Sequence, residues 1–243
     1  MKIRTLTEAE LKNKIVLLRT DFNVPIVKGK IEDEFKMTQS IPTINYLLNN
    51  GCKVLVVSHL GRPEGKKVPS LSLKPVYLYL KKLLPRKKVE FCNLDINAKN
   101  INRIRGYRGD VVLLENIRFF KGEDVNDQKF SKILSKLADI YVDEAFAGVH
   151  RDAASISGVP KYLPAYGGLN VEKEVRYLSQ ALSPKSPSLA FIGGAKVEGG
   201  RLLLDGKRGA MLAAQTAAQL VAVEPTSLPL SLSQKPKIGR AHV

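Results

Sequence analysis

The fold is decided by residues 15–25, which read Ile15-Val16-Leu17-Leu18-Arg19-Thr20-Asp21-Phe22-Asn23-Val24-Pro25. The first four residues are all apolar, as in a strand that is buried on both faces. If the chain stays extended beyond them, Arg19, Asp21 and Asn23 point to one side, because side chains alternate along a strand. Pro25 then ends the ladder, since it has no N–H to donate. The stretch predicts a cation, an anion and an amide together at the carboxyl end of a buried strand.

Similar apolar runs recur along the chain and alternate with segments of helical spacing. Strand-like runs lie at 15–18, 54–57, 111–114, 140–142 and 189–192, and helical stripes lie at 41–48, 76–84, 130–137 and 171–182. Gly51 is the expected C-cap of the first stripe, and Asn126 or Asp127 the N-cap of the third. Strands that alternate with helices predict an α/β fold, a Rossmann-like parallel sheet with helices on both faces.

Polar residues follow the first four of these strands. His59 and Arg62 come after the second strand, Arg118 after the third, and His150 and Arg151 after the fourth. Each would be ordinary surface charge on its own, but open α/β sheets bind ligands outside the carboxyl ends of their strands. Arginine binds carboxylates and phosphates bidentately. We therefore predict one site for a compact ligand with more than one negative charge, in which the histidines donate hydrogen bonds rather than transfer protons.

Composition is compatible with such a ligand. The 243 residues include 39 Lys and Arg against 23 Asp and Glu, a net charge of +16, and 44% of the residues are hydrophobic. The chain can therefore bury a core, and its basic character suits an anionic small ligand or nucleic acid. No His/Cys cluster suggests a protein metal site. The N-terminus lacks a signal-peptide run and no apolar run is long enough to span a bilayer, so we expect a cytoplasmic protein.

The motifs together resemble the phosphoglycerate kinase family. The resemblance is carried by residues 19–25, by Ser58-His59-Leu60-Gly61-Arg62-Pro63, by Leu114-Glu115-Asn116-Ile117-Arg118-Phe119 and by His150-Arg151, with support from Gly193-Gly194-Ala195-Lys196-Val197. It covers about residues 1–198. It implies a two-lobed kinase that transfers a phosphoryl group between 1,3-bisphosphoglycerate and ADP with Mg²⁺, giving 3-phosphoglycerate and ATP. The partners implied are these small molecules, without specific nucleic acid or membrane, and a monomer is expected.

The resemblance also implies roles for single residues. Substrate-binding residues would be Arg19, Asp21, Asn23, Lys36, His59, Arg62, Arg118, His150 and Arg151. Asp21 and Asn23 would hold the hydroxyl and carboxylate region of phosphoglycerate, and Arg62, Arg118 and Arg151 its phosphate. Lys36 and Lys196 would be catalytic, and Lys196 would also contact the nucleotide.

Departures from the family pattern occur at several of these places. An ungapped alignment puts Lys36 where the family has a catalytic arginine, which removes the planar fork and keeps the charge. Asp143-Glu144-Ala145-Phe146-Ala147 replaces an Asn-Asp-Ala-Phe-Gly motif, Ala153 replaces a second histidine, and Gly200 replaces a second lysine. We expect a phosphoglycerate-binding lobe with a connecting helix at 1–185, the start of a nucleotide lobe at 186–198, and an atypical tail at 199–243 that is disordered or chimeric.

Two other functions remain open on the sequence alone. One is a non-catalytic lobe that binds an anionic metabolite, since the motifs beyond residue 198 are missing. The other is a basic nucleic-acid-binding module, which the charge permits although no RNP, helix-turn-helix or zinc pattern is present.

Overall fold

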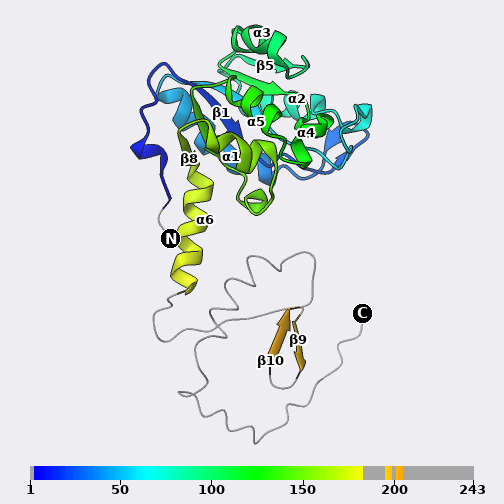
Figure 1. Cartoon of the computed structure of the whole chain (residues 1–243), viewed down its shortest axis with the longest axis vertical. Helices are drawn as coiled ribbons and strands as arrows, with labels where there is room; N and C mark the ends of the chain where they lie inside the picture. The colour runs from blue at the N-terminus through cyan, green and yellow to red at the C-terminus, as the bar shows by residue number, and fades with distance from the viewer. Residues whose placement is uncertain (1–2, 183–194, 199–200, 205–243) are drawn as a thin grey trace, which may run out of the picture. The chain divides into compact units, whose positions relative to one another are not determined.

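The computed structural model describes residues 3–182, 195–198 and 201–204 (Figure 1). The chain divides into two units, Met1–Ser179 and Gln180–Val243, and each is described by itself. Unit 1 carries the sheet and its helices. In unit 2 the described residues are the end of α6 (Leu169–Leu182) and an antiparallel pair of strands, β9 (Ala195–Glu198) and β10 (Arg201–Leu204).

The sheet of unit 1 has six strands, all paired in parallel, in the order β5-β6-β4-β1-β7-β8. The strands are β1 (Ile15–Arg19), β4 (Lys53–Val57), β5 (Val89–Cys92), β6 (Val111–Leu114), β7 (Ile140–Asp143) and β8 (Ala165–Gly167). The four apolar runs predicted from 15–18 to 140–142 are confirmed as β1, β4, β6 and β7, and they are adjacent in the sheet. The predicted run at 189–192 lies outside the described residues.

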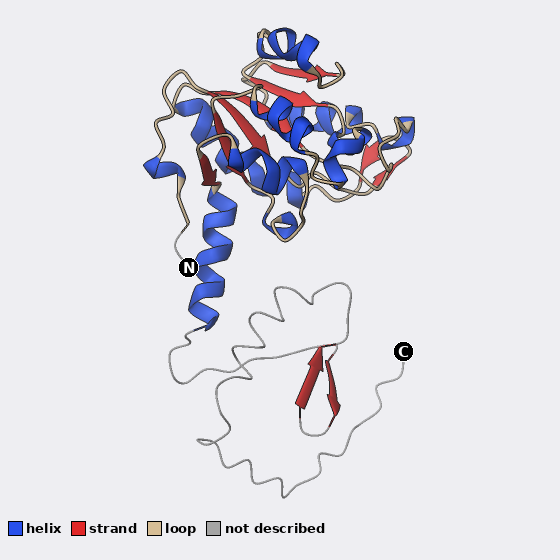
Figure 2. Cartoon of the chain, in the orientation of Figure 1, coloured by secondary structure: helices blue, strands red, loops and turns tan. Residues whose placement is uncertain are grey.

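Helices cover both faces of this sheet, which confirms the α/β architecture (Figure 2). Val16 and Leu18 of β1 belong to one core cluster, with apolar residues of α1 (Phe35–Asn49) and α2 (Lys74–Leu83). Leu17 belongs to the other cluster, with residues of α3 (Ile101–Arg105) and α5 (Gln128–Ser135). Successive residues of β1 thus face opposite helical layers, as the pleat of a strand requires.

Two of the predicted helix ends are confirmed. After α1, Gly51 adopts a φ of +77°, and the N–H groups of Gly51 and Cys52 donate to the carbonyls of Leu48 and Leu47. This left-handed residue ends the helix at the point where glycine costs least. At the start of α5, the Asp127 carboxylate accepts from the Phe130 N–H at 2.7 Å, so Asp127 is the N-cap.

The remaining elements are short, apart from α6 (Leu169–Leu182). They include the hairpin of β2 (Ile26–Val27) and β3 (Lys30–Ile31), α4 (Lys121–Asp124), a π-helical turn at Ala154–Gly158, and 3₁₀ turns at Leu6–Glu8, Pro69–Leu71, Ala98–Asn100, Ile117–Phe119, Phe146–Gly148 and Val159–Lys161. Among the helices described, none is long and apolar enough to cross a membrane.

One sequence-based expectation about β1 is wrong. The strand ends at Arg19, the last residue paired with both β4 and β7, so Pro25 does not end the ladder. Residues 20–25 leave the sheet because the Phe22 N–H donates to the side chain of Ser58 at 2.8 Å instead of to a strand backbone. Asp21 and Asn23 therefore reach the strand ends by a turn of the chain and not by strand alternation.

Candidate anion-binding site

The cationic motifs follow β1, β4, β6 and β7, which are neighbours in the sheet. Because all strands are parallel, the loops after these strands lie at the same edge of the sheet. The sequence places residues from four distant segments there, at 19–23, 59–62, 118 and 150–151.

Hydrogen bonds tie three of these loops together around Gly61. The Gly61 N–H donates to Asn23 Oδ1 at 3.0 Å, and Arg118 Nη1 donates to the Gly61 carbonyl at 2.8 Å. Gly61 has a φ of +62°, and a Cβ there would lie 2.7 Å from the Leu71 side chain, so this position requires glycine. Arg62 follows Gly61 in the chain, and its place in the site stays a prediction.

Arg19, His59 and Arg118 are buried, and we call them the floor of the site. Arg19 is only 2% exposed. Its Nε donates to Ser155 Oγ at 2.8 Å, Nη1 contacts the Thr20 carbonyl, and Nη2 lies 3.2 Å from His59 Nδ1. Arg19 is thus almost wholly buried and contacts protein groups, and its role in substrate binding stays a prediction.

His59 is neutral at physiological pH. Burial lowers the pKa of His59 to about 3, and the charges of Arg19, Arg118 and Arg151 act in the same direction, while Asp21 opposes them. A histidine with this pKa cannot exchange a proton usefully near neutral pH. The lowered pKa argues against proton transfer by His59, and its donation of a hydrogen bond stays a prediction.

Arg118 is held in place by protein acceptors, but one of its guanidinium nitrogens makes no hydrogen bond within the described part of the chain. Its Nε lies 3.0 Å from Asp124 Oδ1, and Nη1 is engaged by Gly61. Among the described residues nothing hydrogen-bonds to Nη2. Burial lowers the pKa of Arg118, Asp124 raises it, and Arg151 and Arg19 lower it further. The contribution of Arg151 shows that it lies close to the floor.

Lys36, Arg62, His150 and Arg151 are exposed, and we call them the rim of the site. Lys36 lies in the first turn of α1, and its Nζ donates to Asp21 Oδ2 at 2.8 Å and to the Asn23 carbonyl at 3.4 Å. Burial alone would raise the pKa of Asp21, but the hydrogen bond and charge of Lys36, with a contribution from His59, lower it. Lys36 thus lies among the predicted substrate residues.

Several polar residues that organise the site were not identified from the sequence. Ser155 and Glu123 lie behind Arg19, and Asp124 pairs with Arg118. Asn116 accepts from the N–H groups of Leu60 and Arg118 and so joins two of the loops. Only Asn116 lay inside a motif that the sequence analysis singled out. Lys196 lies on β9 of unit 2, and its role stays a prediction.

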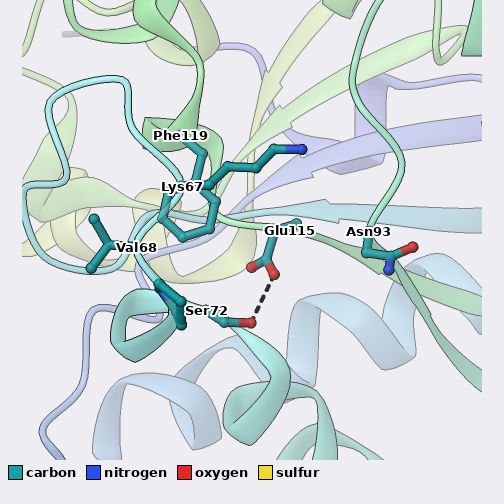
Figure 3. A pocket seen from close by; sticks show the side chains of 7 residues that line it. Lys67, Val68, Ser72, Asn93, Glu115 and Phe119 are labelled. Atoms are coloured by element: carbon teal, nitrogen blue, oxygen red, sulfur yellow. Dashed lines mark hydrogen bonds between the residues drawn. The ribbon is translucent and has the colours of Figure 1, made fainter.

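A hollow of about 350 Å³ is lined by residues that include Lys67, Glu115 and Phe119 (Figure 3). Its cation, Lys67, pairs with Asp95 at 2.6 Å. Its carboxylate, Glu115, accepts from Ser72 Oγ at 2.7 Å and from the Leu73 N–H at 2.8 Å, which fixes the start of α2. These charges are already satisfied within the protein, so the hollow is a weaker anion site than the floor and rim.

The sequence matches the family model described as phosphoglycerate kinase over residues 6–204. The chain belongs to the phosphoglycerate kinase family. The match extends past residue 198, where the recognisable motifs end. The phosphoglycerate kinases of Dictyoglomus turgidum and Coprothermobacter proteolyticus are 46% and 42% identical over 198 and 200 residues. Those alignments cover 80% and 81% of this chain and 49% and 51% of the relatives, so the chain spans about half their length.

Solved phosphoglycerate kinases share the fold of the chain. The structure from Coxiella burnetii has a TM-score of 0.68 at 35% identity, and covers 76% of this chain and 46% of its own. The structure from Pyrococcus horikoshii OT3 has the same TM-score at 30% identity, and covers 76% and 47%. The parallel sheet is therefore that of the family.

Membership of the phosphoglycerate kinase family implies a requirement for a nucleotide and Mg²⁺. Within the described ranges, no three His, Cys, Asp or Glu side chains gather as they would around a metal ion. The floor and rim present mainly cations, which attract anions and repel Mg²⁺. The described residues of unit 1 thus fit an anionic substrate, and they do not fit the metal.

Proposed function

We propose that unit 1 binds 3-phosphoglycerate and 1,3-bisphosphoglycerate as the substrate lobe of a phosphoglycerate kinase, which transfers a phosphoryl group reversibly between 1,3-bisphosphoglycerate and ADP. The observation that carries the proposal is the gathering of floor and rim cations at the ends of four adjacent strands. The membership of the phosphoglycerate kinase family supports it.

The rim is suited to hold the substrate phosphate, because Arg62 and Arg151 are exposed and free to swing onto an anion. Asp21 and Asn23 would hold the hydroxyl and carboxylate region, and the hydrogen bonds of Lys36 to Asp21 and Asn23 support a shared role. Phosphoryl transfer depends chiefly on positioning and charge stabilisation. A floor fixed by hydrogen bonds and a rim of movable cations meet these needs.

Several finer points are carried by the family alone. They are the use of ATP or ADP with Mg²⁺, a nucleotide contact from Lys196, action as a monomer, and a place in the cytoplasm. Because the relatives are about twice as long, we propose the transfer reaction for a protein that includes the rest of their length. For the 243-residue polypeptide itself we expect binding of 3-phosphoglycerate without turnover.

Calorimetric titration of the 243-residue chain with 3-phosphoglycerate tests the substrate proposal. We expect saturable binding that Arg62→Met weakens by about tenfold or more, the effect of one charge-assisted hydrogen bond. Arg86→Met is the matched control, because Arg86 is equally exposed but precedes β5 at the opposite edge of the sheet. Absence of binding by a folded chain, or equal losses in both variants, would sink the proposal.

A coupled assay with ATP, Mg²⁺ and 3-phosphoglycerate tests the absence of turnover. A rate near about 1–100 per second, ordinary for kinases, would show that the described residues and the tail suffice for transfer. Tight binding to one DNA or RNA sequence at physiological salt would instead favour a nucleic-acid-binding module.

A further inference from the structure

Four buried polar side chains beneath the site form a continuous chain of hydrogen bonds. Glu123, Ser155 and Arg19 are 1%, 1% and 2% exposed, and His59 is 7% exposed. Ser155 lies on the π-helical turn that follows the His150-Arg151 motif, and Glu123 lies on α4. None of these contacts is needed to hold an anion directly. We therefore ask which side chains they orient.

The direction of each hydrogen bond is fixed by chemistry. Arginine has donors only, so Arg19 Nε donates to Ser155 Oγ at 2.8 Å. The single Ser155 hydroxyl hydrogen then goes to Glu123 Oε1, and the Ser155 N–H donates to Glu123 Oε2 at 2.9 Å. The Tyr141 hydroxyl donates to the Ser155 carbonyl at 2.8 Å and holds the turn. Arg19 is thereby locked in one orientation.

The same argument determines the state of His59. Arg19 Nη2 lies 3.2 Å from His59 Nδ1, and this nitrogen can only be an acceptor opposite an arginine. A neutral imidazole with an accepting Nδ1 carries its proton on Nε2. A protonated ring would place two N–H groups against each other. Within the described part of the chain, no hydrogen bond engages Nε2.

The charges around the ring agree with the neutral form. Those that face His59 are Arg19 and Asp21 from β1 and the loop after it, Arg118 from the turn after β6, and Arg151 from the segment after β7. Three are cations, and the carboxylate of Asp21 is 4.0 Å from Nδ1 and is paired with Lys36. Burial and these cations hold the pKa of His59 far below its ordinary value.

We propose that Arg19, locked by Ser155 and Glu123, is a positioning residue that fixes His59 as a neutral Nε2–H donor to an anionic oxygen of the ligand. The proposal rests on the proposed function for the identity of that ligand. A neutral His59 donates a hydrogen bond to an unprotonated phosphate or carboxylate oxygen of the ligand. It does not transfer a proton to that oxygen. The site then keeps one protonation state over the physiological pH range.

Nitrogen NMR of the 243-residue chain labelled with ¹⁵N-histidine tests this without any ligand. The chain has three histidines, and His59→Gln assigns the signal of His59. We expect a pyrrole-type Nε2 and a pyridine-type Nδ1 that do not change across the region near pH 6.5 where an ordinary histidine titrates. An Nδ1–H tautomer, or a titration near pH 6.5, would overturn the proposal.

Ser155→Ala tests the positioning role, and Ser135→Ala is the matched control. Ser135 is also buried, but it donates to the Lys132 carbonyl within α5 and does not touch Arg19. We expect Ser155→Ala to mix the two His59 tautomers and to weaken 3-phosphoglycerate binding by about 2- to 10-fold, the range for one net hydrogen bond. His59 signals identical to those of Ser135→Ala would overturn the role of Ser155. If the tautomer is as expected but 3-phosphoglycerate does not bind, the proposed function fails and the fixed state of His59 stands.

Discussion

The floor and the rim contain the same kinds of side chain in different surroundings. Arg19 of the floor is 2% exposed and gives its donors to protein acceptors, whereas Arg151 of the rim is exposed. Burial makes a cation expensive unless it is paired, so floor cations belong to the folded structure. Exposure leaves a cation free for a ligand. The comparison teaches that the number of arginines at a site overstates how many of them can bind substrate.

The largest expected effect is on stability, from Arg19→Met. The change leaves the buried Ser155 hydroxyl without its Arg19 donor and removes the charge that partly offsets the burial of Glu123. A buried polar group left unsatisfied costs about 1–3 kcal/mol. Arg151→Met removes an exposed arginine and should change the free energy of unfolding by less than about 0.5 kcal/mol. Urea unfolding of both variants measures this contrast, and equal losses would abolish the distinction between floor and rim.

Glu144 sharpens the comparison, because it is a buried acid at the same sheet edge without an ion pair among the described residues. It is 3% exposed, its Oε2 has no hydrogen bond within that part, and a Cβ on Gly168 would lie 1.8 Å from this oxygen. Burial raises the pKa of Glu144 to about 8, although hydrogen bonds from Thr43 and the Asn170 N–H lower it in part.

The pH dependence of stability follows from this raised pKa. Between about pH 4.3, the unfolded value, and about pH 8 the folded chain holds a proton that the unfolded chain has lost. The contribution of Glu144 is therefore complete below about pH 4.3 and is lost as pH rises, by about 1.4 kcal/mol per unit, until about pH 8. Urea unfolding from pH 5 to pH 9 should show this loss, and Glu144→Gln should remove it. Glu174→Gln on α6 is the control, and an unchanged pH slope in Glu144→Gln would contradict the assignment.

A rim substitution should affect binding and not stability. We expect Arg151→Met to weaken 3-phosphoglycerate binding by about 1.5–3 kcal/mol, the range for hydrogen bonds to charged groups. Calorimetry at two salt concentrations checks this, because an exposed cation contributes less at high salt. If Arg151→Met binds 3-phosphoglycerate as tightly as the parent chain at low salt, Arg151 does not contact this ligand.

The smallest expected effect concerns Lys36. Its side chain is 43% exposed and already pairs with Asp21, so Lys36→Arg adds a fork without adding charge. We expect the affinity for 3-phosphoglycerate to rise by about 1 kcal/mol, about fivefold. Equal affinities of the parent chain and of Lys36→Arg in calorimetry would mean that residue 36 pairs with Asp21 and does not contact the substrate.

The sequence predicted the centre of the sheet better than its edges. β1, β4, β6 and β7 are buried on both faces and so read as unbroken apolar runs. The edge strands β5 and β8 include half-buried residues, a glutamate and a glycine, and carry no such signal. The sequence pattern detects an edge strand only when apolar and polar residues alternate along it. Strands of three or four residues are too short to show that alternation.

The sequence predicted which polar residues follow the strands, and it did not predict how deeply each of them is buried. Position after an apolar run located the cations, because the carboxyl ends of parallel strands meet. It could not tell that Arg19 turns inward, since its partner Ser155 is 136 residues away and follows two alanines. Burial of a polar side chain depends on such distant partners, and a single sequence does not show them.

The place of β1 at the centre of the sheet also sets the order in which the chain can fold during synthesis. β1 pairs with β7, and the Ile15 N–H donates to Asp139, 124 residues later. At about 5–20 residues per second, a ribosome needs about 6–25 s to deliver that partner. Throughout this interval one side of β1 is an open apolar edge, which is prone to aggregation. Limited proteolysis of nascent chains should find β1 protected only after residue 143 has emerged, and protection at shorter lengths would show that another segment covers the edge first.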